Sequence, residues 1–424
     1  MAELSVEPTS PLIDEVITIT VQGLIKHQHV TIKSGTTEGS SRFSSFACYV
    51  ADEHGIICLS KQPSVSGSYK GIKPMGLFVS MVQDPGQERG RRYMKRRIKT
   101  PQIVTLSVFD RHLNWNEIHS DKKPLITKEV QRYFKRESVK RVEILEGRLR
   151  GTLFIPEGQG PFPGVIDMFG RAGGVIEFRA AMFANRGFIS FALTYMGEDG
   201  LPKRPEELEF SYFEEAVEWF FSYPSTSKVG IGICGVSLGG SLAMLLSVYC
   251  PQVKAVVNIN GPPFFRFPMK PFEKYVLFDS KALPSETHGS TTIYLSRDAI
   301  TNNLTNEMLL PTWTTDAQIL YLVGEDDQSV HPRVAKVLED NYPKHKKKNL
   351  TVIRYPNTGH LIEPPYLPHC KESFNSTINN QGMLFIWGGD TEQHAHAQED
   401  SWKRILQFFR SVLSTGKTTL NSHL

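Results

Sequence analysis

Residues 229–240 place a serine where it could act as a nucleophile. An apolar, β-branched run leads into the pentapeptide 235–239, Gly-Val-Ser-Leu-Gly, and the apolar run 241–246 follows. This pattern predicts a strand, a tight turn and a helix, with the Ser237 hydroxyl at the tip of the turn. The glycines relieve the crowding of a strand that reverses into a helix. The same pentapeptide also fits a glycine-rich turn capped by a serine, so the choice depends on partners downstream.

A serine nucleophile needs a base within hydrogen-bond reach, and the base needs an acceptor that fixes its tautomer and stabilises its cation. The apolar run 319–323 predicts a strand that is followed by three carboxylates at 325–327. The strand predicted over 351–355 is followed by His360. Serine, then acid, then histidine is the chain order of α/β-hydrolases. The sequence therefore predicts nucleophilic catalysis by a serine–acid–histidine triad.

Three adjacent carboxylates, Glu325, Asp326 and Asp327, compete for the role of the acid. We favour Asp327 and expect an exposed acidic turn for the others. His360 is one of 13 histidines, and most histidines occupy core or surface positions without a catalytic role. The strand and glycine that precede it favour the role of base. The predicted catalytic residues are Ser237, Asp327 and His360.

The oxyanion of such a reaction needs two backbone amides. The amide of Leu238 lies at the start of the predicted helix, where the positive helix end favours negative charge. The second amide is expected from the glycine-rich turn 170–174, after the strand predicted over 164–169. We assign it to Gly170 or Arg171. The side chain of Arg171 either faces solvent or binds an anionic ligand.

Two patterns divide the chain. Residues 1–140 contain short alternating runs such as 16–21 between turn residues, which predicts an all-β sandwich. Residues 141–424 alternate strand and helix patterns, which predicts a doubly wound, mostly parallel sheet. The alternation stops at about 261–313. Because ligands bind beyond the carboxyl ends of strands in open α/β sheets, we interpret this stretch as a cap, with an irregular packed loop as an equal alternative.

Composition limits the classes of function. The net charge of this 424-residue chain is +4, too small to indicate nucleic acid binding. Basic residues gather at 89–99, where a solvated loop or edge strand is favoured over a phosphate-binding surface. The five cysteines lack metal-binding spacing, so we expect a reducing compartment and no metal. We expect no membrane span, no secretion signal and no cofactor.

Motifs over nearly the whole chain accompany the serine turn. They are 75–78 (Met-Gly-Leu-Phe), 146–151 (Glu-Gly-Arg-Leu-Arg-Gly), 162–170, 212–216, 359–366 and 387–389 (Trp-Gly-Gly), followed by His394, Ala397, Gln398 and Trp402. This set resembles the family of bile acid-CoA:amino acid N-acyltransferases and type I acyl-CoA thioesterases. The resemblance implies an N-terminal β-sandwich, a C-terminal α/β-hydrolase domain, and long-chain fatty or bile-acid acyl-CoA thioesters as substrates.

The resemblance also implies Ser237 as nucleophile, Asp327 as acid and His360 as base. The bile-acid conjugating branch carries cysteine at the nucleophile position and the thioesterase branch carries serine. Water hydrolyses an acyl oxyester on serine readily, whereas a thioester on cysteine prefers an amine. The serine therefore favours hydrolysis to free acid and CoA, with transfer to taurine or glycine as the alternative. Leu238 departs from the lysine that thioesterase members often carry, and Cys234 is expected in the core.

A third hypothesis is a binding module with an idle triad, which the three intact catalytic residue types disfavour. The tripeptide Ser422-His423-Leu424 approximates the Ser-Lys-Leu peroxisomal address. We therefore expect a peroxisomal location and a peroxisomal import receptor as partner, with the cytoplasm as the alternative.

Overall fold

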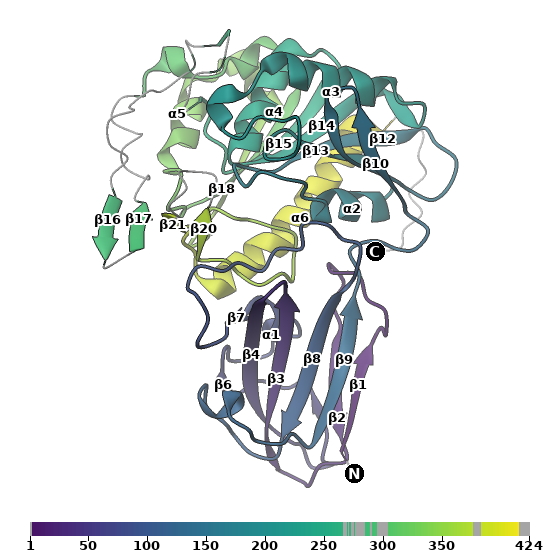
Figure 1. Ribbon diagram of the computed structural model, residues 1–424, viewed down its shortest axis with the longest axis vertical. Coiled ribbons are helices and arrows are strands. Elements are labelled where there is room, and N and C mark those ends of the chain that lie inside the picture. The colour runs from purple at the N-terminus through teal and green to yellow at the C-terminus, as the bar shows by residue number, and fades with distance from the viewer. Residues whose placement is uncertain are drawn as a thin grey trace. The chain divides into compact units, whose positions relative to one another are not determined.

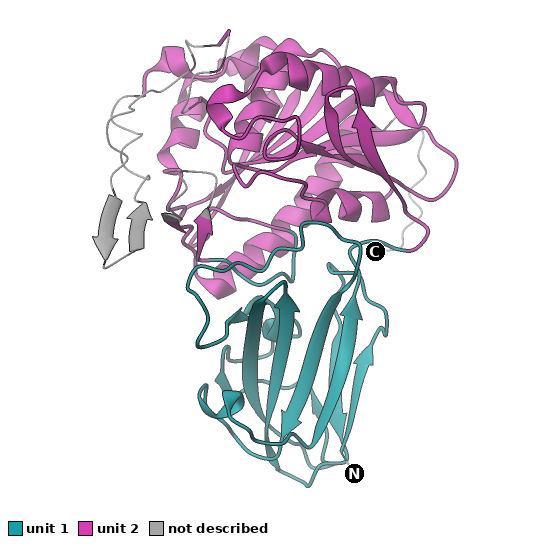
Figure 2. Ribbon diagram, in the orientation of Figure 1, with its two compact units in different colours: residues 1–136, 364–370 teal, residues 137–363, 371–424 magenta. Residues whose placement is uncertain are grey.

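The computed structural model describes residues 2–265, 269, 271–272, 275, 285–288, 291–294, 304–375 and 383–414. The chain forms two compact units, which Figure 2 shows in different colours. Unit 1 contains residues 1–136 and 364–370, and unit 2 contains residues 137–363 and 371–424. No helix among the described residues is both long and apolar enough to cross a membrane.

Unit 1 contains two antiparallel sheets, as its alternating sequence predicts. One sheet has the order β1-β2-β5 and the other β6-β4-β3-β8-β9, while β7 pairs with β4. The strands are β1 (Glu3–Glu7), β2 (Thr18–Gln22), β3 (His29–Glu38), β4 (Ser41–Val50), β5 (Ile57–Cys58), β6 (Ser66–Gly67), β7 (Val82–Gln83), β8 (Gln102–Phe109) and β9 (Ile126–Arg132), with a short helix α1 (Gly76–Val79). In β8, Val104, Leu106 and Val108 are buried, because successive side chains point to opposite faces of a strand.

The basic stretch 89–99, for which a solvated loop or edge strand is favoured, forms ion pairs within unit 1. Lys95 Nζ lies 3.2 Å from Glu38 Oε2, and the Lys95 side chain is only 13% exposed. Arg91 Nη2 lies 2.5 Å from Glu88 Oε2, where both side chains are exposed. These pairs place part of the stretch against acidic residues of its own unit.

Unit 2 is built on a sheet of eight strands with the order β10-β11-β13-β12-β14-β15-β18-β19 (Figure 1). The strands are β10 (Lys140–Glu146), β11 (Leu149–Ile155), β12 (Phe162–Met168), β13 (Ile189–Thr194), β14 (Thr226–Val236), β15 (Val253–Ile259), β18 (Gln318–Gly324) and β19 (Leu350–Tyr355). β11 is antiparallel to β10 and β13, and the other neighbouring pairs are parallel. The predicted α/β-hydrolase sheet is therefore confirmed.

Helices cover both faces of this sheet (Figure 1). The helices are α2 (Phe178–Asn185), α3 (Phe210–Ser222), α4 (Leu238–Tyr249), α5 (Arg333–Asn341) and α6 (Thr391–Leu413). α2 and α6 pack together, with the Phe183 ring 5.0 Å from Trp402 and 5.7 Å from Phe409. α3, α4 and α5 share one apolar core cluster with the strands. Burial on both sides explains why every residue of β13 is buried.

The stretch at 261–313 is described only in part, and most of the predicted cap lies outside the described residues. Two of its described aromatic residues, Phe265 and Phe272, belong to the main core, and the Phe272 ring lies 4.8 Å from Phe210. Four short strands, β16 (Ser285–His288), β17 (Thr291–Tyr294), β20 (Glu372–Asn375) and β21 (Met383–Ile386), form a further sheet in the order β16-β17-β21-β20.

Candidate active site

Ser237 occupies a sharp turn between β14 and α4. Its backbone φ is +55°, a left-handed conformation that a serine rarely adopts. A Cβ on Gly235 would lie 2.1 Å from the Gly239 carbonyl oxygen, and a Cβ on Gly239 would lie 2.4 Å from that of Met168. Only glycine fits at these two positions. The strand, turn and helix predicted from the pentapeptide are all present, and the serine side chain is half-buried.

Asp327 and His360 lie together in loops that follow β18 and β19. His360 Nδ1 is 2.7 Å from Asp327 Oδ2, and both side chains are 1% exposed. The other carboxylate oxygen, Oδ1, accepts hydrogen bonds from the amides of Ser329 at 2.7 Å and Val330 at 2.8 Å. We assign the imidazole proton to Nδ1, because the carboxylate accepts there. Nε2 then carries the lone pair that a general base requires.

The other two carboxylates of this loop serve differently. Glu325 is exposed, as expected for an acidic turn. Asp326 is half-buried, and its carboxylate accepts hydrogen bonds from the Gly389 amide at 2.7 Å and from Gln328 Nε2 at 2.6 Å. Asp326 therefore ties the acid loop to the glycines at 388–389. Of the three candidates, Asp327 is therefore the carboxylate that accepts from the His360 imidazole.

The predicted oxyanion loop lies beside the serine. A Cβ on Gly170 would lie 3.1 Å from Ser237 Cβ and 3.7 Å from Ser237 Oγ. The Tyr195 hydroxyl donates to the Phe169 carbonyl and lies 3.1 Å from that of Gly170. Because these carbonyls are held on the Tyr195 side, the orientation of the loop's peptide groups is fixed. Burial raises the pKa of Tyr195 well above its usual value, so the hydroxyl keeps its proton.

The other two residues predicted for the oxyanion hole are Leu238 and Arg171. Leu238 is the first residue of α4, and its side chain is buried. Arg171 is 27% exposed, and its Nη2 lies 3.9 Å from Glu206 Oε1. A small pocket next to this loop is lined by Phe169, Gly170, Gly173, Gly174, Ile176, Leu193, Tyr195 and Met196.

Cys234 is a core residue and not an alternative nucleophile. Its thiol is fully buried, and burial raises its pKa to about 12. The reactive form of cysteine is the thiolate, which is then scarce at neutral pH. Among the described residues, no group of three histidine, cysteine or acidic side chains could hold a metal ion.

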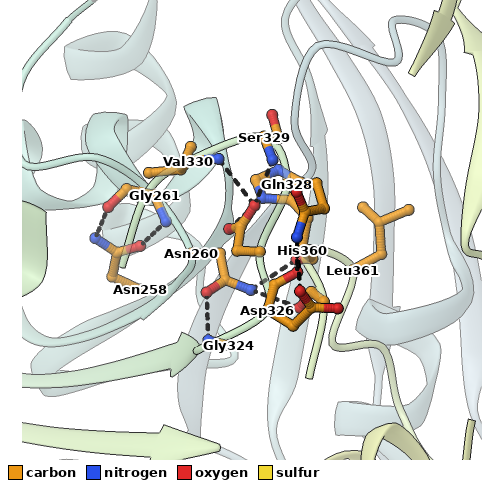
Figure 3. A network of polar contacts seen from close by, with 12 residues as sticks. Asn258, Asn260, Gly261, Gly324, Asp326, Gln328, Ser329, Val330, His360 and Leu361 are labelled. Atoms are coloured by element: carbon orange, nitrogen blue, oxygen red, sulfur yellow. Dashed lines mark hydrogen bonds and ion pairs between the residues drawn. The ribbon is translucent and has the colours of Figure 1, made fainter. Parts of the chain in front are cut away.

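Asn260 is a buried polar residue of the site that sequence reasoning did not single out. It follows β15 with a φ of +50°, and Figure 3 shows it between Gly324 and His360. Asparagine tolerates a left-handed backbone, so an asparagine directly after a strand is the signal that could have pointed to this turn. His394 and Trp387 were named from the sequence only as part of the family motifs, with no role assigned to either. Both also contact the loop that carries His360.

Comparison of the sequence with known families and proteins identifies relatives over nearly the whole chain. The model of the acyl-CoA thioester hydrolase/BAAT N-terminal region matches residues 14–146, and that of the BAAT/acyl-CoA thioester hydrolase C terminal matches residues 208–415. The acyl-coenzyme A amino acid N-acyltransferase 2 of Mus musculus is 37% identical over 428 residues, which cover 97% of this chain and 98% of that protein. The chain belongs to this family.

Named members of the family include both thioesterases and amino acid N-acyltransferases. The peroxisomal succinyl-coenzyme A thioesterase of Mus musculus is 36% identical, over 98% of this chain and 97% of that protein. The bile acid-CoA:amino acid N-acyltransferase of Homo sapiens is 35% identical, over 97% of this chain and 98% of that protein. The predicted resemblance is thereby confirmed, and these identities do not separate hydrolysis from conjugation.

Proposed function

We propose that this family member is an acyl-CoA thioesterase that works through an acyl-enzyme on Ser237. The observation that carries the proposal is the buried 2.7 Å contact between His360 and Asp327, with its imidazole Nε2 left as base. The half-buried serine on the turn after β14 supplies the nucleophile. Acyl-CoA as substrate is supported by the names of the relatives on both branches.

The proposed reaction has two transfers. Ser237 Oγ attacks the thioester carbonyl carbon while His360 Nε2 takes the hydroxyl proton. The oxyanion accepts hydrogen bonds from the Leu238 amide and from an amide of Gly170 or Arg171. Collapse breaks the carbon–sulfur bond, and the imidazolium protonates the CoA sulfur. Water then attacks the ester, gives its proton to His360, and the free acid leaves as Ser237 recovers its proton.

The alternative is transfer of the same acyl group to taurine or glycine, where an amine replaces water in the second step. Formation of the acyl-enzyme and the residues that carry it are the same in both reactions, so the proposed triad fits either one. Hydrolysis is favoured because the residue at the turn is serine, whose oxyester reacts readily with activated water. The amide product would need an acceptor amine close to the ester.

Product analysis tests the proposal and separates the two reactions. Palmitoyl-CoA is incubated with the full chain, with and without taurine or glycine, and products are identified by mass. We expect CoA and free acid without amine, and loss of CoA release in Ser237→Ala. Serine-reactive labelling by a fluorophosphonate should likewise require Ser237. Full CoA release by the alanine variant would overturn the mechanism, and an amide formed in preference to acid would establish conjugation.

We further propose a peroxisomal location. Two observations support it: the tripeptide Ser422-His423-Leu424, which lies outside the described residues, and the peroxisomal thioesterase among the relatives. A fluorescent protein fused to the amino end of the chain should co-localise with peroxisomes and disperse when Leu424 is deleted. Diffuse signal from the intact fusion would contradict the proposed import receptor.

A further inference from the structure

The backbone of His360 is held by side chains from two distant segments. The first is Asn260, after β15. Its Nδ2 donates to the His360 carbonyl oxygen at 2.8 Å and to that of Gly359 at 3.2 Å. Its Oδ1 accepts from the Gly324 amide at 2.7 Å, at the start of the loop that carries Asp327. The buried side chain of Asn260 therefore connects the loop that carries Asp327 to the loop that carries His360 (Figure 3).

The second is His394, in the first turns of α6. Its Nε2 lies 2.8 Å from the Leu361 carbonyl oxygen, and its Nδ1 accepts from the Gly359 amide at 3.2 Å. The carbonyl can only accept, so the proton sits on Nε2 and Nδ1 presents its lone pair. This single neutral tautomer satisfies one peptide group before His360 and one after it. The ring is 1% exposed, so water does not compete for these contacts.

Trp387 also contacts His360, through both its backbone and its ring. Its carbonyl oxygen accepts from the His360 amide at 2.8 Å, and its ring is stacked on the His360 ring with centroids 5.3 Å apart. Together, Asn260, His394 and Trp387 form hydrogen bonds with the N–H and C=O groups of both Gly359 and His360. All the partners come from outside the loop.

We propose that Asn260 and His394 are positioning residues that hold the His360 backbone so that its imidazole stays in hydrogen-bond register with Asp327. The inference rests on the proposed function, because a positioned base is needed only if His360 acts on Ser237. Both residues contact the peptide groups at and next to His360, so we assign them an effect through His360. A catalytic group misplaced by about 1 Å can lose about a hundredfold in rate, which makes such positioning consequential.

His394 is suited to this role because its ring stays neutral. Burial lowers its pKa to about 4, and the charge of Lys371 adds to this effect. A protonated ring would turn a second N–H toward the Gly359 amide and lose that hydrogen bond. The contacts therefore persist over the neutral pH range in which His360 is expected to work.

Four variants and one control separate positioning from folding. Asn260→Gly keeps the left-handed backbone and removes every side-chain contact, whereas Asn260→Asp keeps Oδ1 and turns an acceptor toward two carbonyl oxygens. His394→Phe keeps the ring volume and removes both contacts, whereas His394→Asn retains an acceptor for Gly359. His396→Gln is the matched control, because His396 is exposed on the same helix.

Three readouts are measured on the full chain: kcat and KM for palmitoyl-CoA, the rate of fluorophosphonate labelling, and the downfield proton resonance of His360 Nδ1. We expect Asn260→Gly and His394→Phe to lower kcat and labelling by about ten- to a hundredfold with KM nearly unchanged. The Nδ1 resonance should broaden or move upfield in both. His394→Asn should recover part of the loss, and His396→Gln should match the wild type.

The inference is overturned if Asn260→Gly and His394→Phe leave labelling and the His360 resonance unchanged, or if lower activity tracks only a smaller folded fraction. Failure of the proposed function looks different. There, palmitoyl-CoA is not hydrolysed or Ser237→Ala stays active, while the resonance still reports whether Asn260 and His394 hold His360 against Asp327.

Discussion

Arg179 and Asp167 form an ion pair in which Nε lies 2.5 Å from Oδ1 and both side chains are at most 2% exposed. Asp167 belongs to β12, three residues before Gly170. Arg179 comes from α2, and its Nη2 also donates to the Met168 carbonyl oxygen at 3.2 Å. The pair therefore fixes the end of the strand from which the proposed oxyanion loop departs.

Removing one member of this pair should destabilise the protein strongly. Asp167→Asn leaves the Arg179 charge buried without its counter-ion, and we expect a loss of about 3–5 kcal/mol in the free energy of unfolding. Urea denaturation measures it. The double variant Asp167→Leu/Arg179→Met removes both charges and should cost less than the single one. Asp340→Asn, which breaks an exposed pair with Lys336, should cost less than about 1 kcal/mol. A double variant less stable than the single one would contradict this account.

Tyr195→Phe should lower activity more than stability. The variant keeps the buried ring but loses the hydroxyl that holds the carbonyls of Phe169 and Gly170. A loosened loop no longer presents its amide to the oxyanion, so we expect kcat to fall by about ten- to a hundredfold with little change in KM. The control is Tyr133→Phe, whose hydroxyl bonds to exposed Gln131. An unchanged kcat in Tyr195→Phe would show that the loop orients itself without the tyrosine.

Gly239→Ala should abolish activity by moving the turn. The new Cβ would lie 2.4 Å from the Met168 carbonyl oxygen and 2.8 Å from that of Phe169, and both are backbone atoms that cannot swing away. We expect loss of fluorophosphonate labelling and a lower melting temperature. Gly35→Ala is the control, because its Cβ meets only the Phe43 carbonyl oxygen at 3.8 Å. Normal labelling of Gly239→Ala would show that the turn adapts.

The local elements of the site were predictable because each depends on short-range pattern. The glycines around Ser237 and the strand–loop order of the acid and base follow from backbone crowding and from sheet topology. Asp327 was also favoured over its neighbours from the sequence. By contrast, Asp326 is half-buried and accepts a hydrogen bond from the Gly389 amide, which is far away in the chain, so its environment was not predictable.

The long-range contacts that hold the site could not be predicted from the sequence. Asn260 and His394 act through peptide groups of a loop about a hundred and about thirty residues away, and no periodicity encodes such contacts. The same holds for 364–370, which belongs to unit 1 although unit 2 surrounds it in sequence. There the buried Arg132 donates to the Tyr366 carbonyl oxygen at 3.1 Å, a pairing of residues 234 positions apart.

Acid should destabilise the protein through His394, and the sign follows from its protonation. Its pKa is lowered to about 4 in the folded chain, against an ordinary value of 6.5. Between these values the unfolded chain binds the proton and the folded chain does not, so stability falls as pH decreases. The contribution is fully present above pH 6.5 and is lost toward pH 4.

The measurement compares urea denaturation of the wild type and His394→Asn from pH 7.5 to pH 4.5. Because one such group contributes a slope of at most about 1.4 kcal/mol per pH unit, the wild type should lose stability more steeply than the variant below pH 6.5. The difference between the two curves isolates His394 from other titrating groups, which both proteins share. His396→Gln should follow the wild-type curve. Parallel curves for wild type and His394→Asn would mean that the buried ring takes up its proton in the folded state as easily as in the unfolded one.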